Sequence, residues 1–254
     1  MSVDHELQKR RDFLKDTIRL ETDFSKTDQS LGKEPPPVQK EIPPQSKTIP
    51  LLKPTEWTKR KDAGVHTAIA NRESRRRFSD SALSMEELSF LLWATQGVRK
   101  IRGKNVWRNV PSAGNRHPFD TYLCIRNVSG IACGIYLYLP LSHQLVCQQS
   151  LAPQELAEKI GIAALGQYFI GTAPVAFIWA AVPYRTEWRY GAASHKVIAL
   201  DAGHVCQNLY IACEAIDAGT CAIAAYHQNL MDELIGVDGK EAFVIYLAPV
   251  GKRT

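Results

Sequence analysis

The sequence predicts an α+β fold for a chain of 254 residues. Apolar runs of strand length recur along it, and between them stand stretches whose apolar residues repeat at helical spacing. Three strand-like runs follow one another between residues 121 and 148 with no helix among them. A parallel α/β sheet needs a crossover helix after each strand, so this grouping favours α+β. A chain of this length buries a substantial core.

The first sixty residues differ from the rest. Residues 1–34 are rich in charge, with one short helix expected at Glu6–Arg19. Half of the fourteen prolines lie between residues 35 and 54, which favours extended backbone and excludes a helix or a central strand. Two interpretations stay open: a disordered leader, or an arm laid across a partner subunit. Four spaced apolar residues would anchor such an arm: Ile42, Ile49, Leu51 and Leu52. We expect an arm at residues 1–61 and a folded domain at residues 62–254.

Two helices open the domain. Val65–Arg72 reads as a short helix. Ser84 followed by Glu87 forms a capping box, which marks the start of a second helix. Apolar residues on one face continue it, and Gly97 ends it.

Strands and further helices follow in order. The strands Thr121–Arg126, Gly134–Leu139 and Gln144–Gln148 come first, the last two joined as a hairpin through residues 140–143. Val175–Val182 is a continuous apolar run, hence a strand covered on both faces. The remaining elements are a helix from Pro153 to Gly161, a long core helix at Val197–Ala218, a short helix capped by Asn229 and ended by Gly236, and a last strand at Phe243–Leu247.

Charge and hydropathy restrict the function classes. The formal net charge of +5 suits anionic small molecules and is too weak to imply nucleic acid. The longest apolar stretch, Ile170–Val182, is shorter than the roughly 20 residues that span a bilayer. The charged N-terminus lacks the apolar region of a signal peptide. We therefore expect a soluble, cytoplasmic enzyme with neither a membrane nor a nucleic acid as partner.

The six cysteines indicate neither a metal site nor a disulfide framework. None forms a C-x-x-C pair, and their spacing to His204 and His227 fits no zinc pattern. Disulfide frameworks are typical of small exported domains, and this chain is large and shows no export signal. We expect buried thiols and no metal.

Three short motifs carry the chemical signal. Residues 71–78 hold four arginines and a serine, residues 111–118 form a small-residue turn between two prolines, and Lys252-Arg253 stand near the end. Guanidinium groups bind phosphate through paired hydrogen bonds, and a turn backbone can approach a flat ring. Alone, the arginine cluster would most simply be a solvated helix end. A nucleic-acid patch would need interleaved aromatic residues, and only Phe78 is present.

Together these motifs resemble the FMN-dependent nitroreductase family, and within it the branch of azoline dehydrogenases that form thiazoles and oxazoles. Arg72, Ser74 and Arg76 are in register with an R-x-S-x-R motif, and residues 111–118 with a P-S-x-x-N-x-x-P turn. Residues 201–226 are similar to the family's late helix and the backbone corner beneath the flavin. The resemblance covers about residues 62–254.

The resemblance implies a homodimer with a central mixed or antiparallel sheet flanked by helices and with FMN at the subunit interface. It places the flavin phosphate on Arg72, Ser74, Arg76, Lys252 and Arg253. It places the ring on Pro111, Ser112, Ala113, Gly114, Asn115, Ala224 and Ala225. Three further polar residues would face the substrate: Arg116, His117 and Arg189.

Two departures from the family pattern stand out. Ala224-Ala225 stands where many relatives have a small-residue pair that ends in glycine. An alanine at this position is unstrained only if its φ is negative. Arg189-Tyr190 stands where the azoline dehydrogenases have what looks like a Lys-Tyr pair. Arginine stays protonated and cannot act as a general base. Tyr190 could donate a proton, and a structural cluster with Trp188 explains the segment equally well.

The expected function is reduction of electron-poor acceptors such as nitroaromatics, quinones or activated alkenes. NAD(P)H would be a transient electron donor, because no Rossmann glycine fingerprint is present. Two alternatives remain: a flavin-binding sensor or storage protein without turnover, and an azoline-type dehydrogenase in peptide modification.

Overall fold

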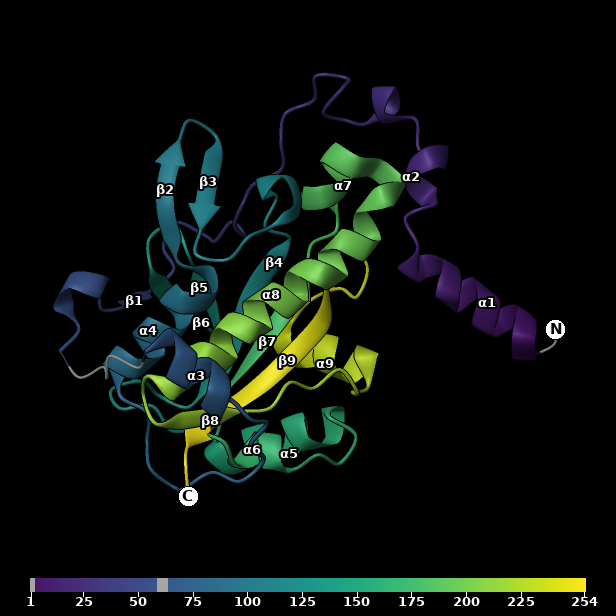
Figure 1. Ribbon diagram of the computed structural model, residues 1–254. Helices are drawn as coiled ribbons and strands as arrows, with labels where there is room; N and C mark the ends of the chain where they lie inside the picture. Colours follow the sequence, from purple (N-terminus) through teal and green to yellow (C-terminus); the bar gives the residue numbers. More distant parts are fainter. Residues whose placement is uncertain (1–2, 59–63) are drawn as a thin grey trace.

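A seven-stranded antiparallel sheet forms the centre of the molecule, and the long helix α8 crosses one of its faces (Figure 1). The computed structural model describes residues 3–58 and 64–254. The strand order is β1-β6-β5-β4-β7-β9-β8, and a separate hairpin pairs β2 with β3. The sheet strands are β1 (Thr48–Pro50), β4 (Phe119–Ile125), β5 (Gly134–Leu139), β6 (Gln144–Ser150), β7 (Val175–Ala181), β8 (Ala218–Thr220) and β9 (Phe243–Lys252), and the hairpin is β2 (Val98–Arg102) and β3 (Asn105–Arg108).

Helices cover both faces of the sheet: α4 (Met85–Gln96) and α8 (His195–Glu214) lie on one, and α5 (Pro153–Ala163) and α9 (Gln228–Ile235) on the other. The other helices are α1 (Val3–Leu14), α2 (Ile18–Glu21), α3 (Val65–Asn71), α6 (Phe169–Thr172) and α7 (Tyr184–Tyr190). The α+β architecture expected from the sequence is confirmed, and the named strand pairs are all antiparallel.

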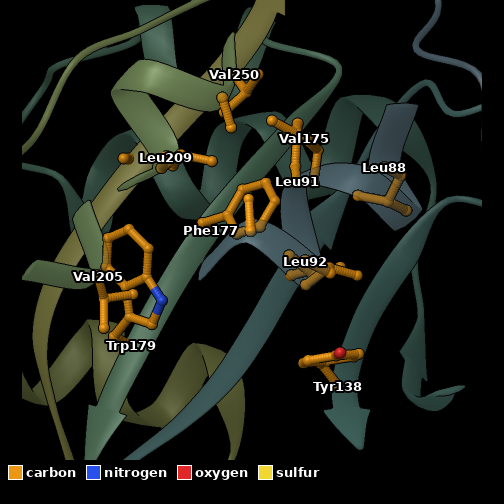
Figure 2. Packing of buried hydrophobic residues seen from close by; sticks show 14 of the residues in the cluster. Leu88, Leu91, Leu92, Tyr138, Val175, Phe177, Trp179, Val205, Leu209 and Val250 are labelled. Carbon is orange, nitrogen blue, oxygen red and sulfur yellow. The ribbon is translucent and has the colours of Figure 1, made fainter. Parts of the chain in front are cut away.

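The alternation of side chains along the strands builds two cores. Leu123, Phe177 and Trp179 face α4 and α8, where Leu88 and Leu209 meet them (Figure 2). The neighbouring positions, among them Tyr122 and Ile178, face α5 and α9 in a second cluster. Successive strand residues point to opposite faces, so the continuous apolar run in β7 serves both cores at once.

The start of α4 follows the sequence prediction. The Ser84 hydroxyl accepts a hydrogen bond from the Glu87 N–H (3.2 Å), and the Glu87 carboxylate accepts one from the Ser84 N–H (2.8 Å). These bonds satisfy N–H groups that a helix start leaves free. Gly97 is the C-cap, as expected.

Several expected bounds were wrong. α8 ends at Glu214 because the chain reverses at Asp217, where φ is +51°, and continues as β8. α9 is capped by His227, whose ring accepts from the Leu230 N–H, and not by Asn229. α5 runs two residues past Gly161. The helix expected at Glu6–Arg19 is divided into α1 and α2. The β2–β3 hairpin and α7 were not expected.

The proline-rich segment lies along its own chain. β1 pairs with β6 at the edge of the sheet. Pro50 lacks a backbone N–H, and an edge strand tolerates this because no strand pairs with its outer side. Leu51 is buried in the core. Residues 28–40, called the strap below, cross from β1 toward α7 and are held there by hydrogen bonds. α1 projects away from the body, and residues 5–14 are exposed (Figure 1).

Among the residues that the structure describes, no helix combines the length and the apolar character needed to cross a bilayer.

Candidate functional site

The turn at residues 111–118 is fixed by a carboxylate from α8. Asp201 accepts hydrogen bonds from the Ser112 hydroxyl (2.6 Å) and from the Ala113 N–H (3.1 Å). Burial raises the pKa of Asp201, and these donors act in the opposite direction. Asp201 is therefore the anchor that holds the small-residue part of the turn against the helix.

Three residues of this turn adopt left-handed backbone conformations. Gly114, Asn115 and His117 have φ values of +57°, +58° and +48°. Such angles are unusual for residues with a side chain and persist only where surrounding contacts enforce them. One such contact joins the His117 Nε2 to the Asn115 Oδ1 at 2.9 Å, and the His117 N–H donates to the Ser112 hydroxyl. His117 is itself buried, so it orients Asn115 and does not face solvent.

Helix α7 packs directly on the backbone of the turn. A β-carbon at Gly114 would lie 2.6 Å from the Tyr190 hydroxyl oxygen and 2.7 Å from the Arg189 Cδ. Glycine is thus required here both for its positive φ and for the close approach. The structure brings together Gly114, Asn115, Arg116, Arg189 and Tyr190, which sequence reasoning had placed in two separate motifs.

Arg116 is buried beside the turn and is not a surface group. Its guanidinium carbon lies 4.6 Å from the centroid of the Trp188 ring, and its Nε donates to the Arg185 carbonyl (2.9 Å). Burial, and next the positive charge of Arg189, lower the pKa of Arg116. Behind it, Arg185 makes two hydrogen bonds to the Asp120 carboxylate, at 2.9 and 3.2 Å.

The arginine cluster at residues 72–77 is organised by Tyr210 of α8. The Tyr210 hydroxyl lies 2.9 Å from the Ser74 hydroxyl and accepts a hydrogen bond from the Ala222 N–H (2.8 Å). The Arg72 guanidinium lies over the Tyr210 ring, 5.4 Å from its centroid. One tyrosine therefore joins the Arg72–Ser74 segment to the chain that leads into Ala224-Ala225.

Most guanidinium groups in this cluster have no acidic partner in the described part of the chain. Arg75 pairs with Glu73 at 2.7 Å. Arg72 is half-buried, and Arg76 and Arg77 are exposed, none of them in an ion pair. Free guanidinium groups beside a serine hydroxyl form a site that an oxyanion can occupy.

Ala224 and Ala225 are exposed, and neither has a positive φ, so their methyl groups cause no backbone strain. The Ala225 carbonyl accepts a hydrogen bond from the Gln167 side chain (2.8 Å). The segment is thereby held at the surface beside Tyr210.

The terminal cations have partners within the chain. The Lys252 ammonium bonds to the Glu87 carboxylate and to the Ile216 carbonyl (2.6 Å). Arg253 pairs with Glu214 and donates to the Ala218 carbonyl. Lys252 and Arg253 lie near the end of the arginine cluster in space, because the Ser79 N–H donates a hydrogen bond to the Lys252 carbonyl. In this arrangement their charges are neutralised.

The candidate site residues thus form two groups at different levels of α8. The turn and α7 contact the helix at Asp201, and the arginine cluster contacts it at Tyr210. Nine residues separate these positions, which corresponds to about 13.5 Å along the axis. In Figure 1, α7 lies at one end of α8, while α3, β8 and the C-terminus gather at the other. Pro111 is exposed at the start of the turn.

Sequence reasoning missed the roles of Tyr210 and Asp201 in the site, whereas it named Trp188 as a structural partner of Arg189. Tyr210 and Asp201 are polar or amphipathic residues on the largely apolar helix α8, a pattern that signals a hydrogen-bond partner in the core. The described residues contain no group of three potential metal ligands, and the six cysteines are free.

Comparisons with known proteins identify the family. The model of the nitroreductase family matches residues 69–252. A Methanocaldococcus jannaschii protein assigned as a nitroreductase is 33% identical over 189 residues, which are 74% of this chain and 91% of that protein.

Solved structures share the fold. A Ralstonia eutropha protein assigned as a nitroreductase gives a TM-score of 0.67 at 22% identity, with 87% of this chain and 95% of that chain covered. A chain of the Escherichia coli microcin synthetase McbBCD complex with truncated pro-MccB17 gives 0.60 at 19%, covering 80% and 77%. A Desulfovibrio desulfuricans protein assigned as a nitroreductase and solved with FMN gives 0.53 at 17%, covering 76% and 88%.

Proposed function

The chain belongs to the nitroreductase family of oxidoreductases, and from that premise we propose that it is an FMN-dependent enzyme that reduces electron-poor acceptors with electrons from NAD(P)H. The observation that carries the proposal is the role of Tyr210. This residue joins the Arg72–Ser74 segment to the backbone before Ala224, two regions that lie 150 residues apart in the chain.

The residues around Tyr210 fit a flavin phosphate. Arg72 and Arg76 are cations without a carboxylate partner in the described chain, and the Ser74 hydroxyl stands beside them. Charge-assisted bonds from guanidinium groups are among the strongest that a protein offers to phosphate. Lys252 and Arg253 can join this site only by leaving Glu87 and Glu214.

The turn fits the flat end of the same cofactor. Pro111, Ser112, Ala113, Gly114 and Asn115 would lie against the ring, with Ala224 and Ala225 at its other edge. Gly114 has no side chain, and Asn115 carries an amide that both donates and accepts. FMN, when bound, supplies two-electron chemistry that takes a hydride from NAD(P)H and passes it to the acceptor.

The chain's own groups position the reactants. Asp201 fixes the turn, and His117 fixes Asn115, so these donors and acceptors need little reorganisation. The Tyr190 hydroxyl lies against Gly114 and can give a proton to an acceptor held there. Arg116 and Arg189 add positive charge at the same place.

We propose a homodimer with the flavin site at the subunit interface. Apolar side chains on α3 and α8 are exposed in the single chain: Val65 at 71%, Ile69 at 60% and Leu200 at 54%. A groove of about 420 Å³ lies between α3, α4 and α8. Large exposed apolar areas mark association surfaces. Light scattering should give a dimer mass, and Ile69→Glu should lower it; a monomer mass for the flavin-loaded wild type would remove the proposal.

Azoline oxidation is the second candidate, and Arg189 argues against it. Ring oxidation needs a base for the carbon-bound proton, and an arginine guanidinium stays protonated in proteins. We expect the holoenzyme to leave a thiazoline-bearing peptide unchanged, where azole formation would remove two hydrogens per ring. Efficient azole formation by the wild type would overturn this assignment.

The main test is direct. The purified protein should have a flavin spectrum, release FMN on denaturation, and consume NAD(P)H when a quinone or nitroaromatic is added. A yellow protein that oxidises no NAD(P)H would be a flavin sensor or store. A colourless protein that cannot be loaded with FMN would contradict the proposal.

A further inference from the structure

Three polar side chains border the turn at Gly114: Arg116 of the turn itself, and Arg189 and Tyr190 of α7. Arg189 and Tyr190 both lie within contact distance of the Gly114 backbone. The Arg116 guanidinium is held in place by Trp188 and by the Arg185 carbonyl. Burial, and next the positive charge of Arg189, lower the pKa of Arg116. The fold thus holds two cations at the same turn.

Three carboxylates on the neighbouring elements already have other partners among the described residues. Asp120 is bonded to Arg185, and Glu187 pairs with His195 at 3.0 Å. Asp201 accepts from Ser112 and Ala113, with His204 at 3.7 Å. In the part of the chain that the structure describes, neither Arg116 nor Arg189 makes an ion pair.

This arrangement has an energetic consequence. Bringing two like charges together in a partly buried place is unfavourable, and an anion between them would relieve the repulsion. Guanidinium forks match the geometry of a carboxylate, and the Tyr190 hydroxyl offers a further donor.

We propose that Arg116 and Arg189 bind a carboxylate group of the electron acceptor. The enzyme's acceptors are then anionic, with the reducible group held against the turn at Gly114. This inference rests on the proposed function, because the acceptor must lie beside the flavin ring that the turn is proposed to hold.

The turn itself favours a carboxylate over a phosphate. Phosphate sites usually use several free backbone N–H groups. Here the N–H groups of Ala113, Asn115, Arg116 and His117 all donate within the protein. The guanidinium groups remain as the donors, and two of them suffice for a carboxylate.

A nitroaromatic acid makes the step concrete. The nitro group of 4-nitrobenzoate accepts the equivalent of one hydride and one proton, loses one oxygen as water and becomes a nitroso group. NAD(P)H is oxidised to NAD(P)⁺, one proton is taken from solution, and the carboxylate is unchanged. The arginines bind and orient this substrate and take no part in bond breaking.

The experiment compares 4-nitrobenzoate with the neutral 4-nitrobenzyl alcohol in the flavin-loaded enzyme. Arg116→Gln and Arg189→Gln should each raise KM for the acid about tenfold, the effect of losing one charge-assisted bond, and should change KM for the alcohol much less. Arg189→Lys should keep part of the preference. Arg102→Gln, an exposed charge on β2, controls for net charge.

Three results would overturn the carboxylate site. One is an equal change for the acid and the alcohol, and another is no change for either. The third is a selective rise in KM for NADPH over NADH, which would assign the arginines to a phosphate of the donor. If Arg116→Gln fails to fold, as its melting curve would show, the half-buried Arg189 still provides the comparison.

Binding without turnover separates this inference from the proposed function. Benzoate binding can be followed by calorimetry and by fluorescence of Trp188, which lies beneath Arg116. If benzoate affinity depends on Arg116 and Arg189 but the protein has no reductase activity, the carboxylate site stands and the proposed function is wrong. If every variant keeps full activity on both acceptors, the proposed function stands and the carboxylate site is wrong.

Discussion

The protein holds two groups of arginines that differ in burial and in what they bond to. The outer group, Arg72 to Arg77, lies at the surface near Tyr210, and Arg75 alone has a carboxylate partner among described residues. The inner group comprises Arg108 and Arg185, which are both buried. Among the described residues, its donors meet carbonyl groups of the strap and of Phe119, the Gln96 side chain, and a single carboxylate, Asp120.

The difference shows how one residue type serves two purposes. A buried guanidinium must have its hydrogen bonds supplied by the fold, so its removal or that of its partner affects stability. An exposed guanidinium without a partner costs the fold little and is available to a ligand. Composition alone does not separate the two groups.

The buried pair should give the largest effect. Asp120→Asn removes the carboxylate that pairs with Arg185 and leaves the Arg185 charge buried. We expect a loss of about 3–5 kcal/mol in the free energy of unfolding. Urea unfolding measures it, and a loss below about 1 kcal/mol would contradict the difference drawn between the two groups.

The outer group should affect binding instead. Arg72→Ala should weaken FMN binding about tenfold or more, since a charge-assisted bond contributes roughly 1.5–3 kcal/mol. Unfolding of the flavin-free protein should change by less than about 0.5 kcal/mol. Arg77→Ala is the matched control, because Arg77 is exposed and lies outside the R-x-S-x-R register. Unchanged FMN occupancy in Arg72→Ala would remove Arg72 from the phosphate site.

The inner group also acts on His117. Burial, and next the charge of Arg108, lower the pKa of His117 to about 3. The unfolded chain, with a pKa near 6.5, takes up this proton first as pH falls, so stability decreases below about pH 6.5. Between pH 7 and pH 5 the decrease should be about 2 kcal/mol.

The measurement is urea unfolding at both pH values. His117→Gln should remove most of this pH dependence, and His66→Gln, a change of an exposed side chain on α3, should keep it. Equal pH dependence in wild type and His117→Gln would show that His117 is not held neutral.

The smallest effect should come from Tyr210. Tyr210→Phe keeps the ring under Arg72 and removes the bonds to Ser74 and Ala222. We expect about 1 kcal/mol weaker FMN binding. Tyr168→Phe, where the side chain is exposed, should have no effect in the same titration.

Much of the fold followed from local pattern. The capping box of α4, the bounds of β5 and the doubly covered strand β7 depend on residues close in sequence. α7 was not expected, because the contacts that stabilise it are made with residues distant in sequence. Arg185 bonds to Asp120, and Trp188 bonds to the strap. The β2–β3 hairpin is mostly exposed, so β2 lacks the alternation that marks a half-buried strand.

The sequence indicates only parts of the proposed site. Motifs single out Arg72, Ser74 and the turn as candidates, since their spacing is local. The partners of Lys252 and Arg253 could not be found this way, because Glu87 lies 165 residues from Lys252. Tyr210 also escaped, since its two hydrogen bonds reach segments that only the folded chain brings near it.

The strap gives the N-terminal segment a role that its composition conceals. The carbonyls of Lys33, Pro37 and Val38 accept hydrogen bonds from Trp188, Arg185 and Arg108. A protease cut that released this segment, or a gene that began at residue 62, would strip these donors of their acceptors. It would also uncover the edge of β6, an unpaired strand that invites aggregation. We therefore expect the prolines to belong to the same cooperative folding unit as the sheet, and a chain trimmed to residues 62–254 to lose solubility.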